Sequence, residues 1–126
     1  MIVHCKHDEL VPIKELKPNP KNPNLHPKQQ IELLAKILKE QGWRNPIVVS
    51  NRSGLIVKGH GRLAAARKAG FTEVPVDFQD YATDKEEKQD LLADNRISEL
   101  SHTDRELVKV LIGDMDDEGL ELTGFD

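Results

Sequence analysis

Residues 58–62, Lys58-Gly59-His60-Gly61-Arg62, combine the residue types of a phosphate-binding loop. Two glycines allow the backbone to turn tightly and to approach a ligand closely. The loop follows the β-branched pair Ile56-Val57 and leads into the helix-forming run 62–69, so the order is strand, glycine loop and helix. The free N–H groups and the dipole of such a helix favour an anion beside Lys58 and Arg62. The pattern therefore predicts a phosphate site.

His60 is the side chain of this loop that can exchange a proton near neutral pH. It could contact a phosphate or act as an acid–base group, or it could cap the helix without any chemistry. Arg62 could hold a phosphate through its fork of N–H donors, or could pair at the surface with Glu73 or Asp77. We take His60 as the candidate catalytic residue, and as phosphate-binding candidates the loop residues Lys58, Gly59, His60, Gly61 and Arg62.

Two other groups of residues have the chemistry of metal ligands. Asp77 and Asp80 follow a predicted strand and could bind a hydrolytic metal, although such carboxylates are more often part of a solvated turn. A short N-terminal cluster could ligate zinc, but the sequence offers no second ligand pair downstream of its members, His4, Cys5, His7 and Asp8. Both are minor alternatives.

Short elements joined by marked turns must position the glycine loop. Strands are predicted at 9–16, 46–50, 55–57 and 74–78, and helices at 27–42 and 62–69. The proline-rich segment 17–24 is expected to be an extended loop, because proline fits neither a helix interior nor a central strand. By the same reasoning, Pro75 predicts that strand 74–78 lies at a free edge of the sheet.

The last third of the sequence is predicted to be helical. Thr83 with Glu86 and Thr103 with Glu106 have the spacing of capping boxes, each of which starts a helix. We expect core packing, or as an alternative a partner helix, for the apolar stripe Leu107, Val108, Leu111, Ile112 and Met115. The resulting organisation is an N-terminal tail (1–8), an α/β core (9–82), a helical C-terminal subregion of the same domain (83–118) and a tail (119–126).

Composition narrows the functional classes. The chain has 126 residues, which suits one domain, and its aromatic share of 4% is too small for the stacking groove of a single-strand-binding protein. With a net charge of −4, contact with DNA would be local or would be made by another domain or protein. A single cysteine and the lack of a long apolar run or signal-peptide pattern predict a cytoplasmic location and no membrane contact.

In order and spacing, several motifs resemble the ParB/sulfiredoxin domain over about residues 9–100. They are Asn19-Pro20, a helix ending in Gly42, Asn45-Pro46-Ile47-Val48-Val49, the run from Gly59 to Ala66, and Glu73-Val74-Pro75-Val76. The chain most resembles the branch of phages and mobile elements, where the domain often precedes a DNA methyltransferase. The resemblance implies an α/β (α+β) fold, with a small mixed sheet, flanking helices and a helical C-terminal end.

The resemblance also implies nucleotide handling, since partition proteins of this family bind and slowly hydrolyse CTP and sulfiredoxins use ATP. It implies that residues 59–62 hold the phosphates and that Asn19 is a further phosphate-binding residue. Asp94 and Asn95 match a later pair that helps to hold the metal and the phosphates. The implied cofactor is Mg²⁺ with ATP or CTP, and a homodimer is a possible assembly.

Several residues differ from the family pattern and reduce the number of activities to be considered. A sulfiredoxin needs a nucleophilic cysteine where this chain has His60, so we do not expect sulfinic acid repair. Fewer charged residues in the loop leave the base of the nucleotide open. The expected function is binding of a nucleoside triphosphate in phage or mobile-element DNA metabolism. If the chain is an enzyme of this kind, we expect it to hydrolyse the nucleotide slowly. The alternatives are a DNA nuclease using His60 with Asp77 or Asp80 and a metal, and a non-catalytic interaction module of a methyltransferase or partition system.

Overall fold

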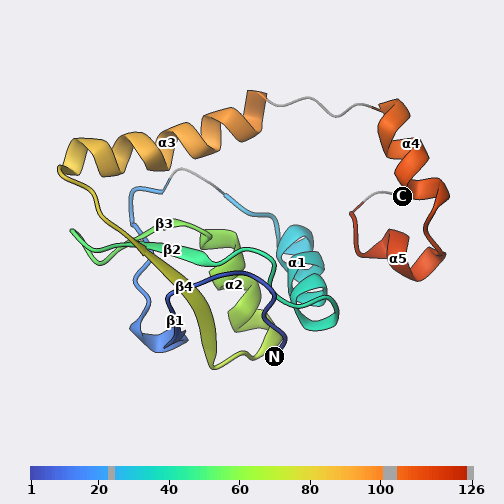
Figure 1. The fold of residues 1–126 in the computed structure, drawn as a ribbon, viewed down its shortest axis with the longest axis horizontal. Coiled ribbons are helices and arrows are strands. Elements are labelled where there is room, and N and C mark those ends of the chain that lie inside the picture. The colour runs from blue at the N-terminus through green and yellow to red at the C-terminus, as the bar shows by residue number, and fades with distance from the viewer. Residues whose placement is uncertain (23–24, 101–104, 125–126) are drawn as a thin grey trace.

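Four short strands form one mixed sheet: β1 (Glu9–Pro12), β2 (Ile47–Ser50), β3 (Ile56–Lys58) and β4 (Glu73–Gln79). The computed structural model, which describes residues 1–22, 25–100 and 105–124, arranges them in the order β1-β4-β2-β3 (Figure 1). β4 is antiparallel to β1 and parallel to β2, and β2 is antiparallel to β3. The predicted mixed α/β class is confirmed.

β4 is an interior strand, so the prediction from Pro75 of a free edge is wrong. Pro75 is fully buried opposite Leu10 of β1. The ladder between β4 and β2 begins at Val76, one residue after the proline, and the missing N–H therefore does not interrupt it. The strand predicted at 9–16 is also shorter than expected, because the chain continues from β1 into the 3₁₀ turn η1 (Ile13–Glu15).

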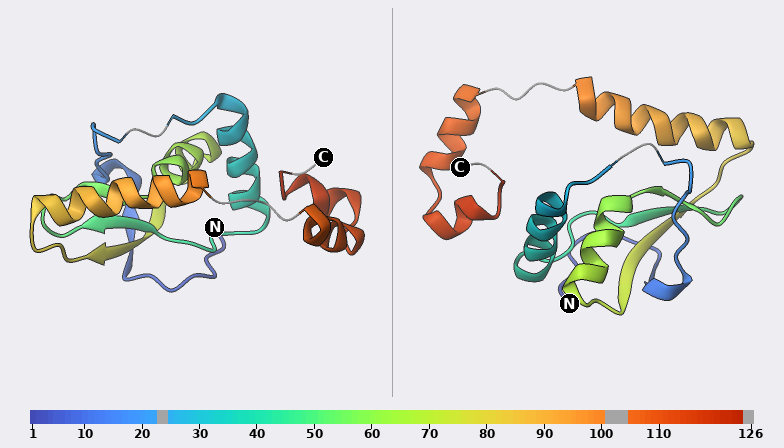
Figure 2. Two further views of the ribbon diagram at one scale, coloured as in Figure 1. Left: turned by 90° about the horizontal axis from the view of Figure 1, so that it is seen from above. Right: turned by 180° about the vertical axis from the view of Figure 1, so that it is seen from behind.

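α1 (Lys28–Glu40) and α2 (His60–Ala69) lie side by side against the sheet (Figure 2). α1 has the predicted position, while α2 begins two residues earlier than predicted. The core between helices and sheet is apolar and includes Leu38, Trp43, Ile47, Ile56, Leu63, Ala65, Ala66, Val74 and Val76. The hydrophobic effect of burying these side chains holds the end of β3 against the start of α2, where the predicted phosphate loop lies.

The N-terminal residues are attached to this core. The backbone N–H of His4 donates to the carbonyl of Trp43, and Trp43 N–H donates to the carbonyl of Ile2. The Asp8 carboxylate accepts the Phe78 N–H at 2.7 Å. Within the described ranges, no helix is long and apolar enough to cross a membrane.

Gly42 and Gly70 both follow helices in the left-handed conformation, with φ of 84° and 82°. A Cβ at Gly42 would lie 2.6 Å from the Ile2 carbonyl oxygen, whereas a Cβ at Gly70 would meet nothing within 4 Å. We expect Gly70→Ala to lower the free energy of unfolding by about 1 kcal/mol through backbone strain alone. Gly42→Ala should lower it by about 2 kcal/mol, because the N-terminal segment must also move. Urea unfolding of the two variants measures the difference, and equal losses would contradict the proposed packing of Ile2 on Gly42.

α3 (Asp84–Leu100) runs above β3 (Figure 1). The predicted helix start is confirmed, but of the two bonds of the capping box only the one to Thr83 forms, because Glu86 bonds to the N–H of Ala82 instead of that of Thr83. Thr83 Oγ1 accepts the Glu86 N–H at 3.1 Å, and the Glu86 carboxylate accepts the Ala82 N–H at 2.8 Å. Thr103, of the second predicted box, lies outside the described residues. The helix predicted there is present as α4 (Arg105–Gly113), and it is followed by a short helix, α5 (Asp117–Glu121), which was not predicted.

α4 and α5 lie beyond α1, away from the sheet (Figures 1 and 2). Lys36 of α1 forms an ion pair with Glu121 of α5 at 2.9 Å. In the predicted apolar stripe, Leu107 is 62% exposed and Leu111 is 60% exposed, so the expectation of core packing is wrong. Helical periodicity identifies an apolar face but does not identify the surface that covers it.

Candidate functional site

A pocket of about 180 Å³ opens at the N-terminus of α2. Its walls come from the end of β3, the first turn of α2, the loop before α1, and α3. The structure therefore brings Asp94 of α3 to the predicted phosphate loop. The lining comprises the loop residues Lys58, Gly59, His60, Gly61 and Arg62 together with Asn22, His26, Leu34, Val57, Leu91 and Asp94.

The two glycines of the loop are required for different structural reasons. Gly59 is the residue between β3 and α2, and its φ of 103° is rarely adopted by other residues. A Cβ there would also lie 3.2 Å from the Cα of Ile47. Gly61, which was predicted to share in the turn, lies inside α2, where a Cβ would be 3.0 Å from Cε1 of His26. Gly61 thus makes room for an imidazole that the sequence analysis missed.

His60 connects the proline-rich loop to α2. Its Nε2 accepts the backbone N–H of Asn19 at 3.1 Å, which requires that nitrogen to be unprotonated. Burial, reinforced by the charge of His26, lowers the pKa of His60 below its ordinary value. Asn19 is not among the residues that line the pocket. It contacts His60 through its backbone, and its side chain accepts the Lys21 N–H within its own loop. Phosphate binding by Asn19 and catalysis by His60 stay predictions.

The lowered pKa of His60 predicts how stability depends on pH. Between the lowered pKa and the ordinary value of 6.5, the unfolded chain holds more protons than the folded chain. The stabilisation by neutral His60 is therefore present above the ordinary pKa and is lost as the pH falls towards the lowered one. From about pH 7 to about pH 5, we expect the unfolding midpoint of wild type to fall more steeply than that of His60→Gln.

Glutamine at position 60 can still accept the Asn19 N–H but does not titrate in this range, which makes it the appropriate comparison for thermal unfolding at several pH values. Parallel curves for wild type and His60→Gln would contradict the neutral state of the imidazole.

Arg62 folds back beneath the loop. Nη2 donates to the carbonyl of Pro46 at 3.0 Å, just before β2. Its Nε is buried and finds no hydrogen-bond partner among the described residues. Burial lowers the pKa of Arg62, and the Asp94 carboxylate opposes that effect. A buried N–H donor without a partner is rare in folded proteins. This atom is not exposed to the pocket, so a ligand would meet the other guanidinium nitrogens, of which Nη2 is bonded to Pro46.

Lys58 and Asp94 complete the charged groups of the pocket. Lys58 Nζ lies 3.4 Å from Asp90 Oδ1, and the hydroxyl of Tyr81 donates to the other Asp90 oxygen at 2.6 Å. Asp94 is one helical turn further along α3 and is exposed on the pocket. Asn95 belongs to the same helix, but its side chain lies outside the described part of the chain.

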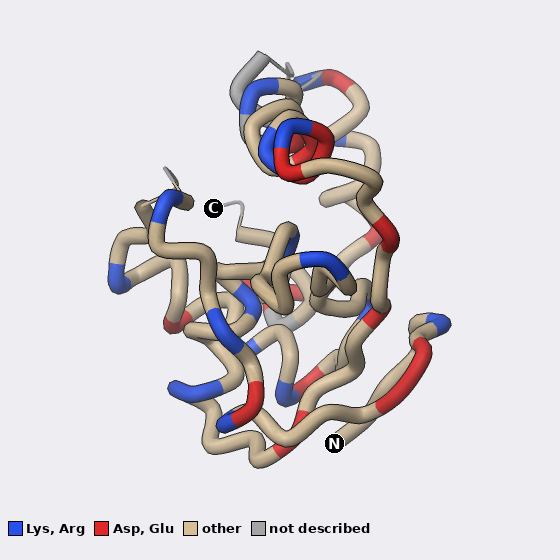
Figure 3. Tube along the Cα trace, turned by 90° about the vertical axis from the view of Figure 1, so that its left-hand side faces the viewer, with Lys and Arg blue, Asp and Glu red and all other residues tan. Residues whose placement is uncertain are grey.

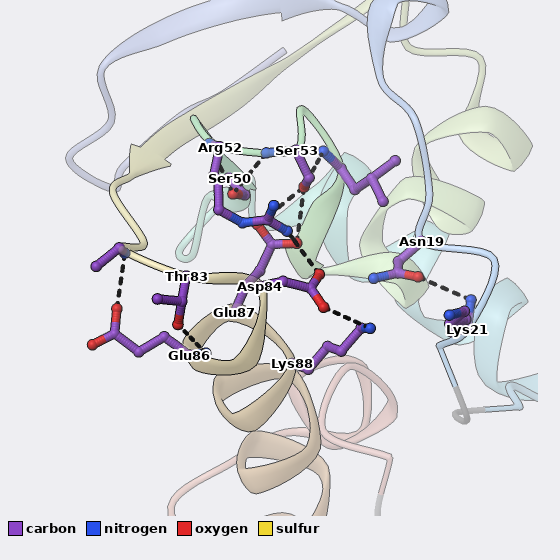
Figure 4. A network of polar contacts seen from close by, with 12 residues as sticks. Asn19, Lys21, Ser50, Arg52, Ser53, Thr83, Asp84, Glu86, Glu87 and Lys88 are labelled. Atoms are coloured by element: carbon purple, nitrogen blue, oxygen red, sulfur yellow. Dashed lines mark hydrogen bonds and ion pairs between the residues drawn. The ribbon is translucent and has the colours of Figure 1, made fainter.

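A polar network holds the start of α3 on the turn between β2 and β3 (Figure 4). The Glu87 side chain is 3% exposed and accepts the Ser53 hydroxyl at 3.0 and 2.9 Å. Arg52 lies 3.4 Å from the same carboxylate and 2.9 Å from Asp84. This network has no signal in the sequence, because its two halves lie more than thirty positions apart and share no motif.

The other predicted chemical groups lie elsewhere. The described lining of the pocket includes neither Asp77 nor Asp80, and Asp80 accepts from the Asn51 side chain at 2.8 Å. In the part of the chain that the structure describes, no three His, Cys, Asp or Glu side chains are grouped so that they could hold a metal. This also applies to the N-terminal cluster of His4, Cys5, His7 and Asp8. Acidic and basic residues are interspersed along the trace (Figure 3).

Comparisons with known proteins give concordant results. The family model of the ParB N-terminal domain matches residues 3–96. The curated ParB-like nuclease domain-containing protein YnaK of Escherichia coli (strain K12) is 33% identical over 78 residues, which are 62% of this chain and 88% of that protein.

Solved structures also match. The C-terminally truncated chromosome-partitioning protein ParB from Caulobacter crescentus, complexed with CTP-gamma-S, has a TM-score of 0.66 and 26% identity over 94% of this chain and 71% of its own. The same protein complexed to the centromeric parS site has a TM-score of 0.60 and 22% identity, over 94% of this chain and 66% of its own, and this match shows the fold alone.

Proposed function

The chain belongs to the ParB N-terminal domain family, and on this premise we propose that it binds a nucleoside triphosphate with Mg²⁺ at the N-terminus of α2. The observation that carries the proposal is the convergence of Lys58, Arg62 and Asp94 on one pocket beside Gly59. The similarity to a ParB that was crystallised with CTP-gamma-S supports a nucleotide as the ligand class.

The chemistry of the pocket suits a phosphate chain. The first-turn N–H groups of α2 and its dipole favour negative charge, and Gly59 lets the ligand approach the backbone. Lys58 would leave its ion pair with Asp90 and bind a phosphate oxygen. Arg62 would donate to the phosphates from the N–H groups that are not bonded to Pro46. His60, neutral while it accepts from Asn19, would keep the proline-rich loop against the site and would present its other ring nitrogen to the terminal phosphate or to water.

The residues present also fit Mg²⁺. In nucleotide sites this ion uses one or two protein carboxylates, keeps several waters, and takes its other ligands from the phosphates. Asp94 supplies an exposed carboxylate in the pocket, and Asn95 is proposed to help it. Bound Mg²⁺ would neutralise charge on the phosphates. We propose ATP or CTP as the nucleotide, slow turnover if any, and a setting in phage or mobile-element DNA metabolism, with DNA contacted through another domain or protein.

Calorimetric titration with ATP, CTP, GTP and their monophosphates in the presence of Mg²⁺ tests the proposal. We expect one triphosphate to bind more tightly than its monophosphate, and Lys58→Ala to weaken that binding about tenfold through loss of one charge-assisted contact. Lys68→Ala removes an equal charge from the other end of α2 and should bind like wild type. Absence of binding to every triphosphate, or equal effects of the two lysine variants, would overturn the proposed site.

Metal-dependent cleavage of DNA is a second candidate, favoured by the nuclease domain named in the relative YnaK. Its residues would be those predicted from the sequence, His60 with Asp77 or Asp80, although the structure places both carboxylates outside the pocket that His60 lines. We would incubate supercoiled plasmid with Mg²⁺ or Mn²⁺ and wild type, His60→Ala or Asp80→Asn. Nicking that both substitutions abolish would establish this activity, and nicking that neither substitution changes would exclude these residues from it.

A further inference from the structure

His26 stands directly over the first turn of α2. It belongs to the loop before α1 and lines the pocket. The position of a Cβ on Gly61 would be 3.0 Å from Cε1, 3.2 Å from Nε2 and 3.3 Å from Nδ1 of this imidazole. Three ring atoms are thus in close range of one glycine, and any larger residue at position 61 would displace the ring.

The two imidazoles of the pocket are held in opposite ways. Nε2 of His60 accepts an N–H, so a proton on that atom would break the contact with Asn19. Nδ1 of His26 lies 2.9 Å from the side-chain oxygen of Gln30. An amide oxygen only accepts hydrogen bonds, so Nδ1 of His26 carries the proton of the neutral ring. Nε2 of His26 can therefore take up a second proton while the bond to Gln30 remains.

The charged groups around His26 determine whether such a proton would be favourable. From β3, Lys58 faces the pocket but is paired with Asp90. From α2 come neutral His60 and the Arg62 guanidinium, which is tied to the Pro46 carbonyl, and from α3 comes the Asp94 carboxylate. The pocket therefore holds charges of both signs, and a bound polyphosphate would add negative charge beside His26 and favour a proton on its free nitrogen.

We propose that His26 is the proton-dependent anion ligand of this pocket. One proton moves from solvent to Nε2 as the phosphate group binds, and the imidazolium then donates Nε2–H to a phosphate oxygen and Nδ1–H to Gln30. The inference rests on the proposed nucleotide function and adds its regulation: binding tightens as the pH falls through the neutral range. His60 takes no part in this proton uptake.

Proton-linked calorimetry tests the inference. Wild type, His26→Gln and His4→Gln are titrated with CTP or ATP and Mg²⁺ at about pH 6 and about pH 8, in buffers of different ionisation enthalpy. For wild type we expect up to one proton taken up per nucleotide and about tenfold tighter binding at the lower pH. The exposed His4 lies outside the pocket lining, so His4→Gln should behave like wild type.

His26→Gln should bind with nearly equal affinity at both pH values. Any proton that the phosphates themselves bind contributes equally to all three proteins, so the difference between wild type and His26→Gln reports the imidazole. Long-range ¹H–¹⁵N spectra should show protonation of Nε2 of His26 on addition of nucleotide. Identical pH profiles for wild type and His26→Gln, with nucleotide bound, would overturn this inference and leave the proposed function standing. Failure of wild type to bind any nucleotide at either pH would overturn both.

Discussion

Replacement of Glu87 by alanine is expected to lower the free energy of unfolding by about 3 kcal/mol, through the loss of buried charge-assisted hydrogen bonds. The carboxylate is 3% exposed and accepts the Ser53 hydroxyl with both oxygens. Without it, the hydroxyl stays half-buried and Arg52 keeps only its contact with Asp84. A cavity left by the side chain adds to the loss.

Two variants separate these contributions in urea unfolding. Glu87→Gln keeps the volume and one acceptor oxygen, and should lose roughly half as much stability as Glu87→Ala. Glu86→Ala removes a neighbouring carboxylate that is exposed and accepts the Ala82 N–H, so it should lose less than 1 kcal/mol, roughly the value of a helix cap. Equal unfolding curves for Glu87→Ala and Glu86→Ala would show that the network of Figure 4 does not hold α3.

The network also matters for the pocket. Glu87 and Asp94 lie seven residues apart on α3, two helical turns, so both project towards the body of the protein. Leu91, buried between them, packs at the pocket wall. Loosening the start of α3 in Glu87→Ala should therefore also weaken nucleotide binding, although none of the atoms removed lines the pocket at the end of β3.

Local sequence patterns were sufficient to predict the secondary structure of residues 56–69, the part of the candidate site that is continuous in the chain. The order of a β-branched pair, Gly59 and an alanine-rich run predicted the strand, the turn and the helix, because each residue type strongly limits the backbone there. The resemblance added Asp94 from a distant helix, and the pocket includes it. The boundaries moved by one or two residues, and Gly61 was assigned to the turn although its role is to leave space for His26.

The features that were missed depend on tertiary contacts between residues without a common motif. Pro75 suggested an edge strand, but which strand of a sheet is central depends on pairing partners far along the chain. The stripe containing Leu107 and Leu111 has the periodicity of a core helix, and nothing in that period shows which surface it faces. His26 and Glu87 have ordinary local sequences, and their environments come from α2 and from the turn after β2.

Arg62→Ala is expected to weaken triphosphate binding by about 100-fold, which corresponds to loss of roughly 3 kcal/mol from two charge-assisted hydrogen bonds. The guanidinium is the partly buried cation of the pocket, and its buried Nε has no acceptor among the described residues. Because the guanidinium is largely buried, its bond to a phosphate oxygen should be stronger than that of Lys58, whose side chain is 35% exposed.

The same side chain also supports the fold, since Nη2 donates to the Pro46 carbonyl. Thermal unfolding of Arg62→Ala must therefore accompany the calorimetry, and titrations belong well below its melting midpoint. Arg62→Lys keeps the charge but loses the planar fork and the bond geometry at Pro46, so its affinity should lie between those of wild type and Arg62→Ala. Arg67→Ala, an exposed arginine in the last turn of the same helix, provides the matched control and should bind normally.

The ordering of these variants distinguishes two roles for Arg62. If it grips the phosphates, affinity falls in the order wild type, Arg62→Lys, Arg62→Ala, even at temperatures where all three are fully folded. If it only joins α2 to the start of β2, folded Arg62→Ala binds nucleotide like wild type and the loss appears solely in the melting midpoint. The position of Arg62 in the pocket lining, together with Lys58 and Asp94, favours the first outcome, because the guanidinium keeps N–H donors besides the one bonded to Pro46.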